Sequence, residues 1–357
     1  MRETEIEKLR RRIDLIDWRI LQLLNERMEI ALKVRKHKQG VFDPERERTV
    51  LENVRQASRN LITEHFSQAI FGTIMEESKR LQEAPITLIG FQGEHGAFSE
   101  VAALSYHRNL VPIPCREFKD VFEEVENGAL DYGIVPVENS LEGQIAEVND
   151  LLIETPLNVV GEVVIPIHHC LLTLPETNYR ELKVVYSHPQ ALAQCRQFIK
   201  RHRLEPRPFY DTAGAAKMLS QERPEASAVI ASRLCAELYR LEIIKENIED
   251  HPSNVTRFVV LSRTGRGEGN KCSIVFSVAH RPGALFEVLR VFYERHLNLT
   301  RIESRPEKGN PGRYVFFADF EGNSGDERVS SALDEVRSRT LTFKLLGFYK
   351  AFREVSP

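Results

Sequence analysis

The sequence predicts a multidomain chain with an all-α helical domain, a two-lobed α/β domain and an α+β ferredoxin-like domain, in that order. Three observations predict this class: a helical hydrophobic repeat near the N-terminus, alternating strand-like and helical runs in the middle, and a βαββαβ order at the end. The chain has 357 residues, more than one ordinary core holds, so two or three domains are expected. We place them at residues 1–84, 85–264 and 265–357.

The composition is that of an ordinary globular protein, with 42% hydrophobic and 28% charged residues. The net charge of −3 gives no argument for nucleic acid as a partner. Five cysteines without a CxxC pair predict free thiols in a reducing compartment, with no disulfide framework and no zinc site. The charged N-terminal stretch is unlike a signal peptide, and no apolar run approaches the ~20 residues of a membrane span. We therefore expect a cytoplasmic protein with no membrane partner, metal or cofactor.

The first segment carries apolar residues whose steps alternate between three and four, from Ile6 to Val34. This repeat predicts one helix over about Thr4–Gln39, roughly 50 Å long at about 1.5 Å per residue. So long a helix cannot bury its apolar seam within so short a segment. The same helix of a second chain is the expected partner, which predicts a homodimer or a higher homo-oligomer. Two shorter helices are predicted after Pro44 and over about residues 63–82.

One position of this seam is cationic, because the step after Leu23 falls on Arg27. Lys38 lies almost three turns further and shares the same face of the helix. A cation in an apolar seam is costly unless an anion meets it, so the pair indicates an internal anion site. An internal salt bridge to Asp or Glu is the alternative. Arg10 lies about 260° around the helix from Arg27 and is expected to reach into the partner's pocket.

Residues 9–48 and 73–82 resemble the all-helical chorismate mutase family, whose members are intertwined dimers. The positions that match the family's substrate contacts are Arg10, Arg27, Lys38, Asp43, Arg46, Glu47, Ser78 and Gln82. The resemblance implies rearrangement of chorismate to prephenate, which requires two carboxylates to be held and charge on an ether oxygen to be stabilised. Lys38 and Gln82 are the expected catalytic donors to that oxygen, and Asp43 or Glu47 would accept from the substrate hydroxyl. The alternative for Gln82 is a cap at the helix end.

From Pro85 onwards, strand-like runs alternate with helical ones. The apolar run 158–174 is long for one strand and predicts a crossing between two lobes, whose cleft is a common place for a ligand. His168 and His169 lie within it. Because adjacent residues on a strand point to opposite faces, we interpret them as ordinary structure and not as metal ligands.

The stretch Asp131–Gln144, DYGIVPVENSLEGQ, indicates a ligand site where a buried strand ends. Glu138, Asn139 and Ser140 follow the apolar run directly. Ligands of open α/β sheets bind beyond the carboxyl ends of strands, and a helix N-terminus offers backbone N–H groups to an anion. We therefore expect a small anionic substrate here. A capped junction without a ligand is the alternative.

Together with GAFSE, SHPQ and NVTRF, the PVENS motif resembles the prephenate dehydratase family. The resemblance implies a two-lobed domain that converts prephenate to phenylpyruvate. The family's key hydroxyl falls on Thr256, which we expect to donate a hydrogen bond to the departing ring hydroxyl. Glu138 is the alternative acid, if burial raises its pKa. The expected substrate-binding residues are Asn139, Ser140, Ser187, Gln190, Arg257 and Phe258. Strand alternation offers Arg257 a second role, support of the site from behind.

After the glycine-rich stretch TGRGEGN, the last segment resembles the phenylalanine-responsive ACT domain, through PGAL at 282–285 and ESRP at 303–306. The resemblance implies L-phenylalanine as an inhibitory effector. The expected effector-binding residues are Gly283, Ala284, Leu285, Glu303, Ser304, Arg305 and Pro306.

The three resemblances together imply the bifunctional chorismate mutase/prephenate dehydratase family of phenylalanine biosynthesis, with feedback by L-phenylalanine. Two alternatives stay open. One is arogenate dehydratase activity in the middle domain, because GFQGEHGAFSE has some of the look of that subgroup. The other is a non-catalytic two-lobed ligand-binding protein with a helical dimerisation arm.

Overall fold

The computed structural model describes residues 5–38, 40–59, 61–265, 268–307, 310 and 312–352. The chain divides into two compact units. The first comprises residues 1–87 with 128–130, and the second comprises residues 88–127 with 131–357. Each unit is described by itself.

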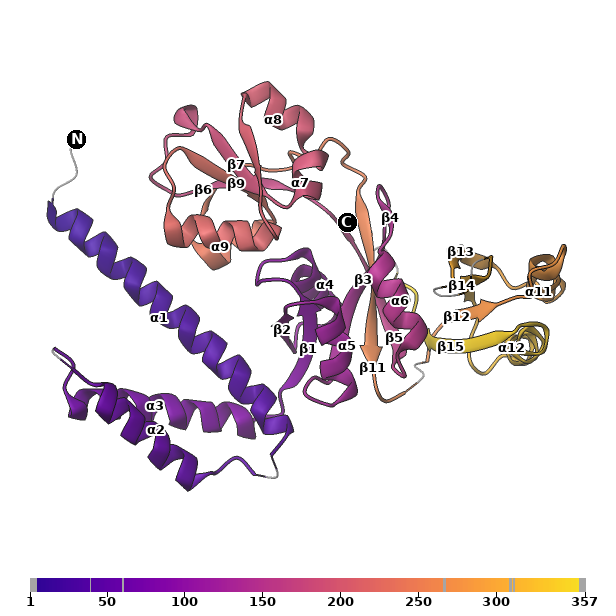
Figure 1. Ribbon diagram of the computed structural model, residues 1–357, viewed down its shortest axis with the longest axis horizontal. Helices are drawn as coiled ribbons and strands as arrows, with labels where there is room; N and C mark the ends of the chain where they lie inside the picture. The colour runs from indigo at the N-terminus through magenta and orange to yellow at the C-terminus, as the bar shows by residue number, and fades with distance from the viewer. Residues whose placement is uncertain are drawn as a thin grey trace. The chain divides into compact units, whose positions relative to one another are not determined.

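The first unit is built from three helices, α1 (Glu5–Lys36), α2 (Pro44–Ala57) and α3 (Glu64–Glu83) (Figure 1). Side chains cap the two shorter helices, because Asp43 accepts from Arg46 N at 3.0 Å and Thr63 accepts from Phe66 N at 3.2 Å. Helix α3 packs against both α1 and α2. The all-helical expectation is confirmed. The predicted ends of the long helix, Thr4 and Gln39, lie outside the described residues.

The apolar seam of α1 is not covered within this chain. All its residues are exposed, from 40% for Val34 to 64% for Leu23. Only Trp18 and Leu32 of the helix are buried. An apolar face of this length is costly in water, at about 25 cal/mol for each Å².

The second unit begins with a mixed sheet in the order β2-β1-β3-β11-β5, with β4 paired to β3. Its strands are β1 (Thr87–Gln92), β2 (Leu110–Cys115), β3 (Tyr132–Asn139), β4 (Gly143–Gln144), β5 (Asn158–Pro166) and β11 (Val255–Ser262). Helices α4 (Phe98–Tyr106), α5 (Phe118–Glu126) and α6 (Ala146–Glu154) accompany it. Strand β11 runs antiparallel to both β3 and β5, and its Thr256 lies opposite Asn139. The end of β3 therefore meets the start of β11.

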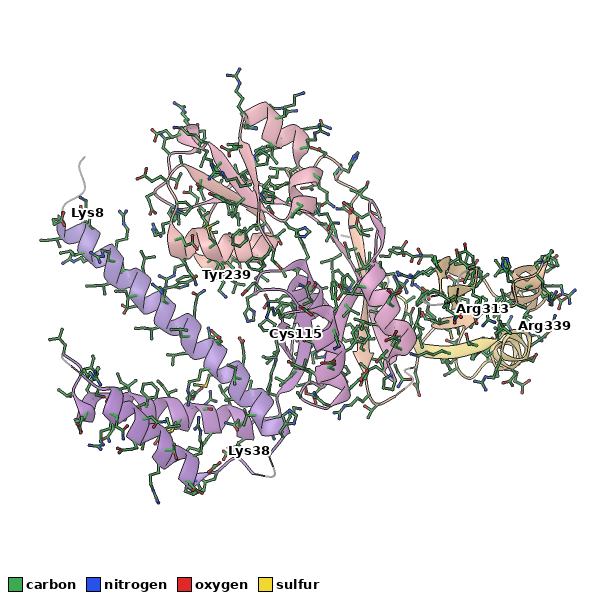
Figure 2. All side chains as sticks on the ribbon, in the orientation of Figure 1. Lys8, Lys38, Cys115, Tyr239, Arg313 and Arg339 are labelled. Carbon is green, nitrogen blue, oxygen red and sulfur yellow. The ribbon has the colours of Figure 1, made fainter. Side chains whose placement is uncertain are left out.

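A second sheet has the order β10-β6-β9-β7-β8. Its strands are β6 (Cys170–Thr173), β7 (Val184–Ser187), β8 (Glu205–Pro208), β9 (Ser227–Ala231) and β10 (Glu242–Lys245). Its helices are η1 (Tyr179–Glu181), α7 (Pro189–Gln194), α8 (Arg196–His202), α9 (Thr212–Glu222) and α10 (Arg233–Tyr239). The chain enters this lobe after β5 and returns before β11, so the two-lobed expectation is confirmed. Figure 2 labels Cys115 in the first lobe and Tyr239 in the second.

The last sheet has the order β13-β14-β12-β15. Its elements are β12 (Lys271–Ser277), α11 (Ala284–Glu294), β13 (Leu299–Pro306), β14 (Tyr314–Glu321), α12 (Glu327–Arg339) and β15 (Thr342–Tyr349). Ile274, Phe292, Phe320 and Val336 lie in the core between this sheet and its helices. The predicted βαββαβ order is confirmed.

All five cysteines lie among the described residues, where they are buried and form no disulfide. Within the described ranges, no helix is both long and apolar enough to cross a membrane. No cluster of His, Cys, Asp and Glu among the same residues has the arrangement of a metal site.

Candidate active sites

The first candidate site lies around the loop between α1 and α2. Lys38, just past the end of α1 (Figure 2), places its Nζ 3.2 Å from Asp43 Oδ2. A hydrogen bond from Arg46 N and a second from Lys38 hold the pKa of Asp43 below its usual range. Asp43 is therefore a carboxylate, able to accept from a substrate hydroxyl. A pocket of about 640 Å³ lies here, lined by Lys38, Gly40, Phe42, Asp43, Pro44, Glu45 and Arg48.

Ser78 and Gln82 meet on the buried face of α3. Gln82 Nε2 lies 3.1 Å from Ser78 Oγ and 3.2 Å from Ser78 O, so it donates back along its own helix. The helix end is closed instead by Ala84 N, which donates to Arg80 O. These contacts give the alternative of a helix cap no support. Glu47, predicted at the same site, pairs with Lys79 at 3.0 Å.

Arg10 and Arg27, both predicted to bind substrate, lie on α1. Arg27 is half-buried, and its Nη1 is buried without a hydrogen-bond partner among the residues that the structure describes. A buried N–H without an acceptor costs free energy that an anionic ligand would recover. Arg10 is exposed on the same helix.

The second candidate site is a buried hydrogen-bond network where β3 meets β11. Asn139 Oδ1 accepts from Leu141 N at 3.0 Å and from Glu142 N at 3.1 Å. Backbone N–H groups only donate, so these contacts fix the orientation of the Asn139 amide. Asn139 Nδ2 then donates to Thr256 Oγ1 at 2.9 Å. The Thr256 oxygen therefore accepts in this contact, which does not use the Thr256 proton.

Ser140 and Glu138 flank this network. Ser140 is exposed, and its Oγ accepts from Val255 N at 3.0 Å. Glu138 is half-buried on β3 and lies opposite Arg257 and Gln144 in the strand register. The structure thus brings these predicted residues together with Thr256.

The predicted residues of the second lobe lie elsewhere. Ser187 is buried, and its Oγ donates to Ile230 O at 2.6 Å, which occupies the hydroxyl within its own sheet. Gln190 is half-buried in the first turn of α7, where its backbone N donates to His188 Nδ1 at 3.3 Å.

Arg257 and Phe258, both expected at the substrate, are placed in the interior. Phe258 is 2% exposed and belongs to the core. Arg257 Nε donates to Glu162 at 2.8 Å, and Nη1 lies 2.7 Å from Asp319 on β14. Burial raises the pKa of Asp319, but the charges of Arg257, Arg301 and Lys271 and a hydrogen bond from Ser273 together outweigh burial and hold that pKa below its usual range. These contacts support the second role that strand alternation offered Arg257, behind the site.

Three residues of the network were missing from the predicted site. Asn254 Oδ1 accepts from Asn139 Nδ2 at 2.8 Å, and Asn254 Nδ2 donates to Gln194 Oε1 at 3.3 Å. His169 Nε2 lies 2.9 Å from the same Gln194 oxygen. Asn254 stands in the NVTRF motif itself, and Gln194 is one helical turn beyond Gln190, so both carried a usable signal. His169 carried none.

The predicted effector residues lie at the start of α11 and along β13. Gly283 has φ +82° at the N-cap of α11, a left-handed conformation that a side chain would strain. Arg305 Nη2 lies 2.7 Å from Asp150 on α6, and Nη1 donates to Ala146 O at 2.8 Å. Glu303 pairs with Arg301. Arg305 is therefore held by the first lobe.

Comparison with known proteins accounts for this arrangement. Three family models match in order: chorismate mutase type II over residues 9–83, prephenate dehydratase over 89–266, and the ACT domain over 273–338. A bifunctional chorismate mutase/prephenate dehydratase from Aquifex aeolicus is 36% identical over 359 residues, covering 97% of this chain and 98% of its own. The chain belongs to the bifunctional chorismate mutase/prephenate dehydratase family.

Two further relatives match the chain in part. Arogenate dehydratase/prephenate dehydratase 2 from Arabidopsis thaliana is 40% identical over 274 residues, covering 73% of this chain and 72% of its own. The structure of a prephenate dehydratase from Arthrobacter aurescens in complex with L-Phe has a TM-score of 0.68 and 32% identity, covering 74% of this chain and 90% of that one. As a bifunctional chorismate mutase/prephenate dehydratase with an ACT domain, the chain is an enzyme. The alternative of a non-catalytic binding protein is set aside.

Proposed function

We propose that the two activities of this family are performed by the two groups of residues described above. Arg27, Lys38 and Gln82 would serve the rearrangement of chorismate, and Thr256 would serve the conversion of prephenate to phenylpyruvate. The observation that carries the proposal is the hydrogen bond from Asn139 Nδ2 to Thr256 Oγ1, which leaves Thr256 as a donor.

The mutase step needs positioning and charge stabilisation, with no proton transfer and no covalent intermediate. Arg27 and the partner subunit's Arg10 would bind the two carboxylates, because the planar guanidinium matches a carboxylate. Lys38 and Gln82 would donate to the ether oxygen as negative charge grows there. Nη1 of Arg27, which has no hydrogen-bond partner among the described residues, supports a ligand at this position.

In the dehydratase step, the bond between the ring and its carboxylate breaks and carbon dioxide leaves. The electron pair of that bond completes the aromatic ring as the ring hydroxyl departs, takes up one proton and becomes water. A threonine hydroxyl is too weak an acid to lose its proton here, so Thr256 would donate a hydrogen bond. Glu138, next to Asn139 on β3, or solvent would supply the proton.

We further propose that L-phenylalanine binds near Gly283–Leu285 and Glu303–Pro306 and inhibits the dehydratase. The L-Phe complex of the Arthrobacter aurescens relative supports this ligand class. Strand β13 is an edge strand of its sheet, so a second copy of the domain would complete the pocket. A dimer in the cytoplasm, suggested by the uncovered seam of α1 and by the five described cysteines without a disulfide, agrees with this arrangement.

The test is the fate of chorismate in the purified protein. Wild type should form prephenate and then phenylpyruvate. Thr256→Ala should accumulate prephenate, with a dehydratase kcat at least ~100-fold lower, in the range of lost acid–base assistance. Thr256→Ser should be milder, because the hydroxyl remains. If the alanine variant keeps most of its dehydratase rate, Thr256 is structural and Glu138 becomes the principal group.

The identity of the second substrate is tested in the same assay. The Arabidopsis thaliana relative carries both names, so arogenate is the competing substrate. A higher kcat/KM for prephenate than for arogenate is expected, and the reverse order would reassign the middle domain.

A further inference from the structure

A continuous line of side-chain hydrogen bonds runs from Thr256 to His169. Asn139 Nδ2 contacts both Thr256 Oγ1 at 2.9 Å and Asn254 Oδ1 at 2.8 Å. Asn254 Nδ2 contacts Gln194 Oε1 at 3.3 Å, and His169 Nε2 contacts that same oxygen at 2.9 Å. His169 lies between β5 and β6, Gln194 ends α7, and Asn254 directly precedes β11. The line thus joins the second lobe to both segments that connect the lobes.

The direction of every hydrogen bond in this line follows from the backbone. The two backbone N–H groups on Asn139 Oδ1 turn the Asn139 nitrogen towards Asn254. A side-chain amide has its oxygen on one side and its nitrogen on the other, so Asn254 must turn its nitrogen towards Gln194. The Gln194 oxygen then accepts, and His169 Nε2 must carry the proton that it donates.

The surroundings of His169 keep the ring neutral. The residue is 2% exposed, and Phe98 packs edge-on against it with ring centroids 5.4 Å apart. Burial lowers the pKa of His169, although Gln194 and Glu249 act in the opposite direction and His168 adds to the lowering. The Glu249 carboxylate is already engaged by His168 Nδ1 and by His169 N. Nδ1 of His169 is buried and has no partner within the described part of the chain. A second proton would therefore leave a buried N–H without an acceptor.

We propose that His169 is a positioning residue of the dehydratase, a role that rests on the function proposed for Thr256. Its Nε2–H holds the Gln194 oxygen towards Asn254, and this keeps the Asn254 oxygen on Asn139. The Asn139 amide then donates to Thr256, and the Thr256 proton faces the substrate. Without the imidazole donor, the Gln194 amide can rotate and exchange the positions of its oxygen and nitrogen. The directions of the hydrogen bonds from Gln194 to Thr256 are then no longer fixed.

The test compares two substitutions at one position in the full-length protein. His169→Gln keeps an N–H donor at nearly the same distance from the backbone, whereas His169→Leu removes it. The leucine variant should lose at least ~30-fold in dehydratase kcat, with KM within about 3-fold of wild type. The glutamine variant should stay within about 5-fold in kcat, and both variants should keep the mutase rate. Full activity of the leucine variant, or an equal loss in both variants, would overturn the proposal.

Acidity provides a second measurement. Well below the ordinary histidine pKa of about 6.5, protonation of His169 at Nδ1 keeps the Nε2–H but puts a charge and an N–H without an acceptor among the described residues into this buried site. The network should rearrange to relieve that cost, so wild-type dehydratase kcat should fall there. The His169→Gln variant should lack this fall, and His168→Gln, at the adjacent exposed imidazole, should retain it. The same fall in all three proteins would assign the titration to another group and contradict the proposal.

The tautomer itself can be observed in wild type, so the proposal does not depend on the folding of any variant. Nitrogen-15 NMR of the histidine rings near pH 7.5 should show His169 neutral, with its proton on Nε2. A proton on Nδ1, or a doubly protonated ring, would refute it. If Thr256→Ala keeps its activity, the role proposed for Thr256 fails, and the positioning role of His169 fails with it. If Thr256→Ala is inactive and His169→Leu is active, only this inference fails.

Discussion

The two proposed active sites differ in how many of their polar groups already have partners within one chain. Around the mutase residues, Arg10 is exposed, Arg27 Nη1 lacks a partner among the described residues, and the apolar seam of α1 is uncovered. Around the dehydratase residues, Asn139, Asn254 and Thr256 are buried and hydrogen-bonded to one another. The proposed mutase site would therefore need a second copy of the chain to be complete, whereas the hydrogen bonds of the proposed dehydratase site form within one chain.

The chemistry explains this difference. Binding two carboxylates requires several cations, and in the proposed arrangement a long guanidinium side chain from another subunit would supply one without a rigid scaffold. Assisting the departure of one hydroxyl requires a single donor with the correct polarity. A buried network of hydrogen bonds whose donors and acceptors are fixed in direction provides that polarity.

The largest effect should come from breaking the seam of α1. Ile16→Glu puts a charge on the apolar face and should prevent pairing, because burying an unpaired carboxylate is costly. The mutase rate should fall at least ~100-fold, while the dehydratase rate stays within about 3-fold. Both rates and the sedimentation of the protein would be measured.

Asn25→Glu is the matched control for that experiment. Asn25 is exposed on α1, nine residues after Ile16 and therefore about 180° around the helix. It should leave association and both activities unchanged. A monomeric Ile16→Glu protein with full mutase activity would remove the contrast between the two sites.

A mixture of two inactive chains can show directly that the mutase site is shared. Arg10→Ala and Arg27→Ala should each lose most mutase activity. In heterodimers, one pocket carries both changes and the other carries neither, so activity should return to roughly a quarter of wild type after random exchange. Mass spectrometry would verify the exchange, and no recovery after it would place Arg10 outside the partner's pocket.

A pH profile sharpens the comparison at Gln82. An amide donates at every ordinary pH, whereas a glutamate donates only when protonated, with a reference pKa of about 4.3. The mutase rate of Gln82→Glu should therefore be ~10-fold or more lower at pH 8 than at pH 5, at saturating chorismate. Wild type should vary little from this group. Identical profiles for the two proteins would return Gln82 to a structural role.

The smallest effect concerns how L-phenylalanine bound at the ACT domain would inhibit the dehydratase site. Helix α6 begins two residues after β4, and Arg305 holds it through Asp150 and Ala146 O. Asp150→Asn should leave L-phenylalanine binding within about 3-fold by calorimetry but raise the concentration needed for inhibition ~5-fold or more. Coupling between sites is typically about 1–3 kcal/mol.

Glu147→Gln removes the same charge from an exposed position on the same helix and should not affect inhibition. Undiminished feedback in Asp150→Asn would show that the signal passes elsewhere, for example through Arg257. A large loss of L-phenylalanine binding would instead mean that the contact shapes the effector pocket itself.

Local patterns in the sequence predicted the elements and their polar ends, because helix and strand periodicity depend on near neighbours. The seam of α1, the strand ends at Asn139 and Thr256 and the last βαββαβ unit are of this kind. Hydrogen-bond partners that are far apart in the sequence produce no such local pattern. Asn139 and Asn254 are 115 positions apart, and His169 and Gln194 are 25 apart. Strand alternation turned Arg257 away from Thr256, but nothing local identified Asp319 as its partner.

The pair of Arg257 and Asp319 has a consequence for how this enzyme can change. Arg257 lies on the strand of Thr256, and Asp319 lies in the ACT domain. Losing one member of a buried ion pair costs about 3–5 kcal/mol, a large part of the stability of an ordinary domain. The ACT sheet also comes so close that a Cβ on Gly347 would lie 2.1 Å from Val159 O. The dehydratase and ACT domains should therefore unfold in one cooperative transition. Deleting the ACT domain would remove Asp319 and leave the charge of Arg257, next to Thr256 on β11, without this partner. A feedback-resistant form of this enzyme, whether evolved or engineered, would therefore have to change single effector-binding residues and keep the ACT domain.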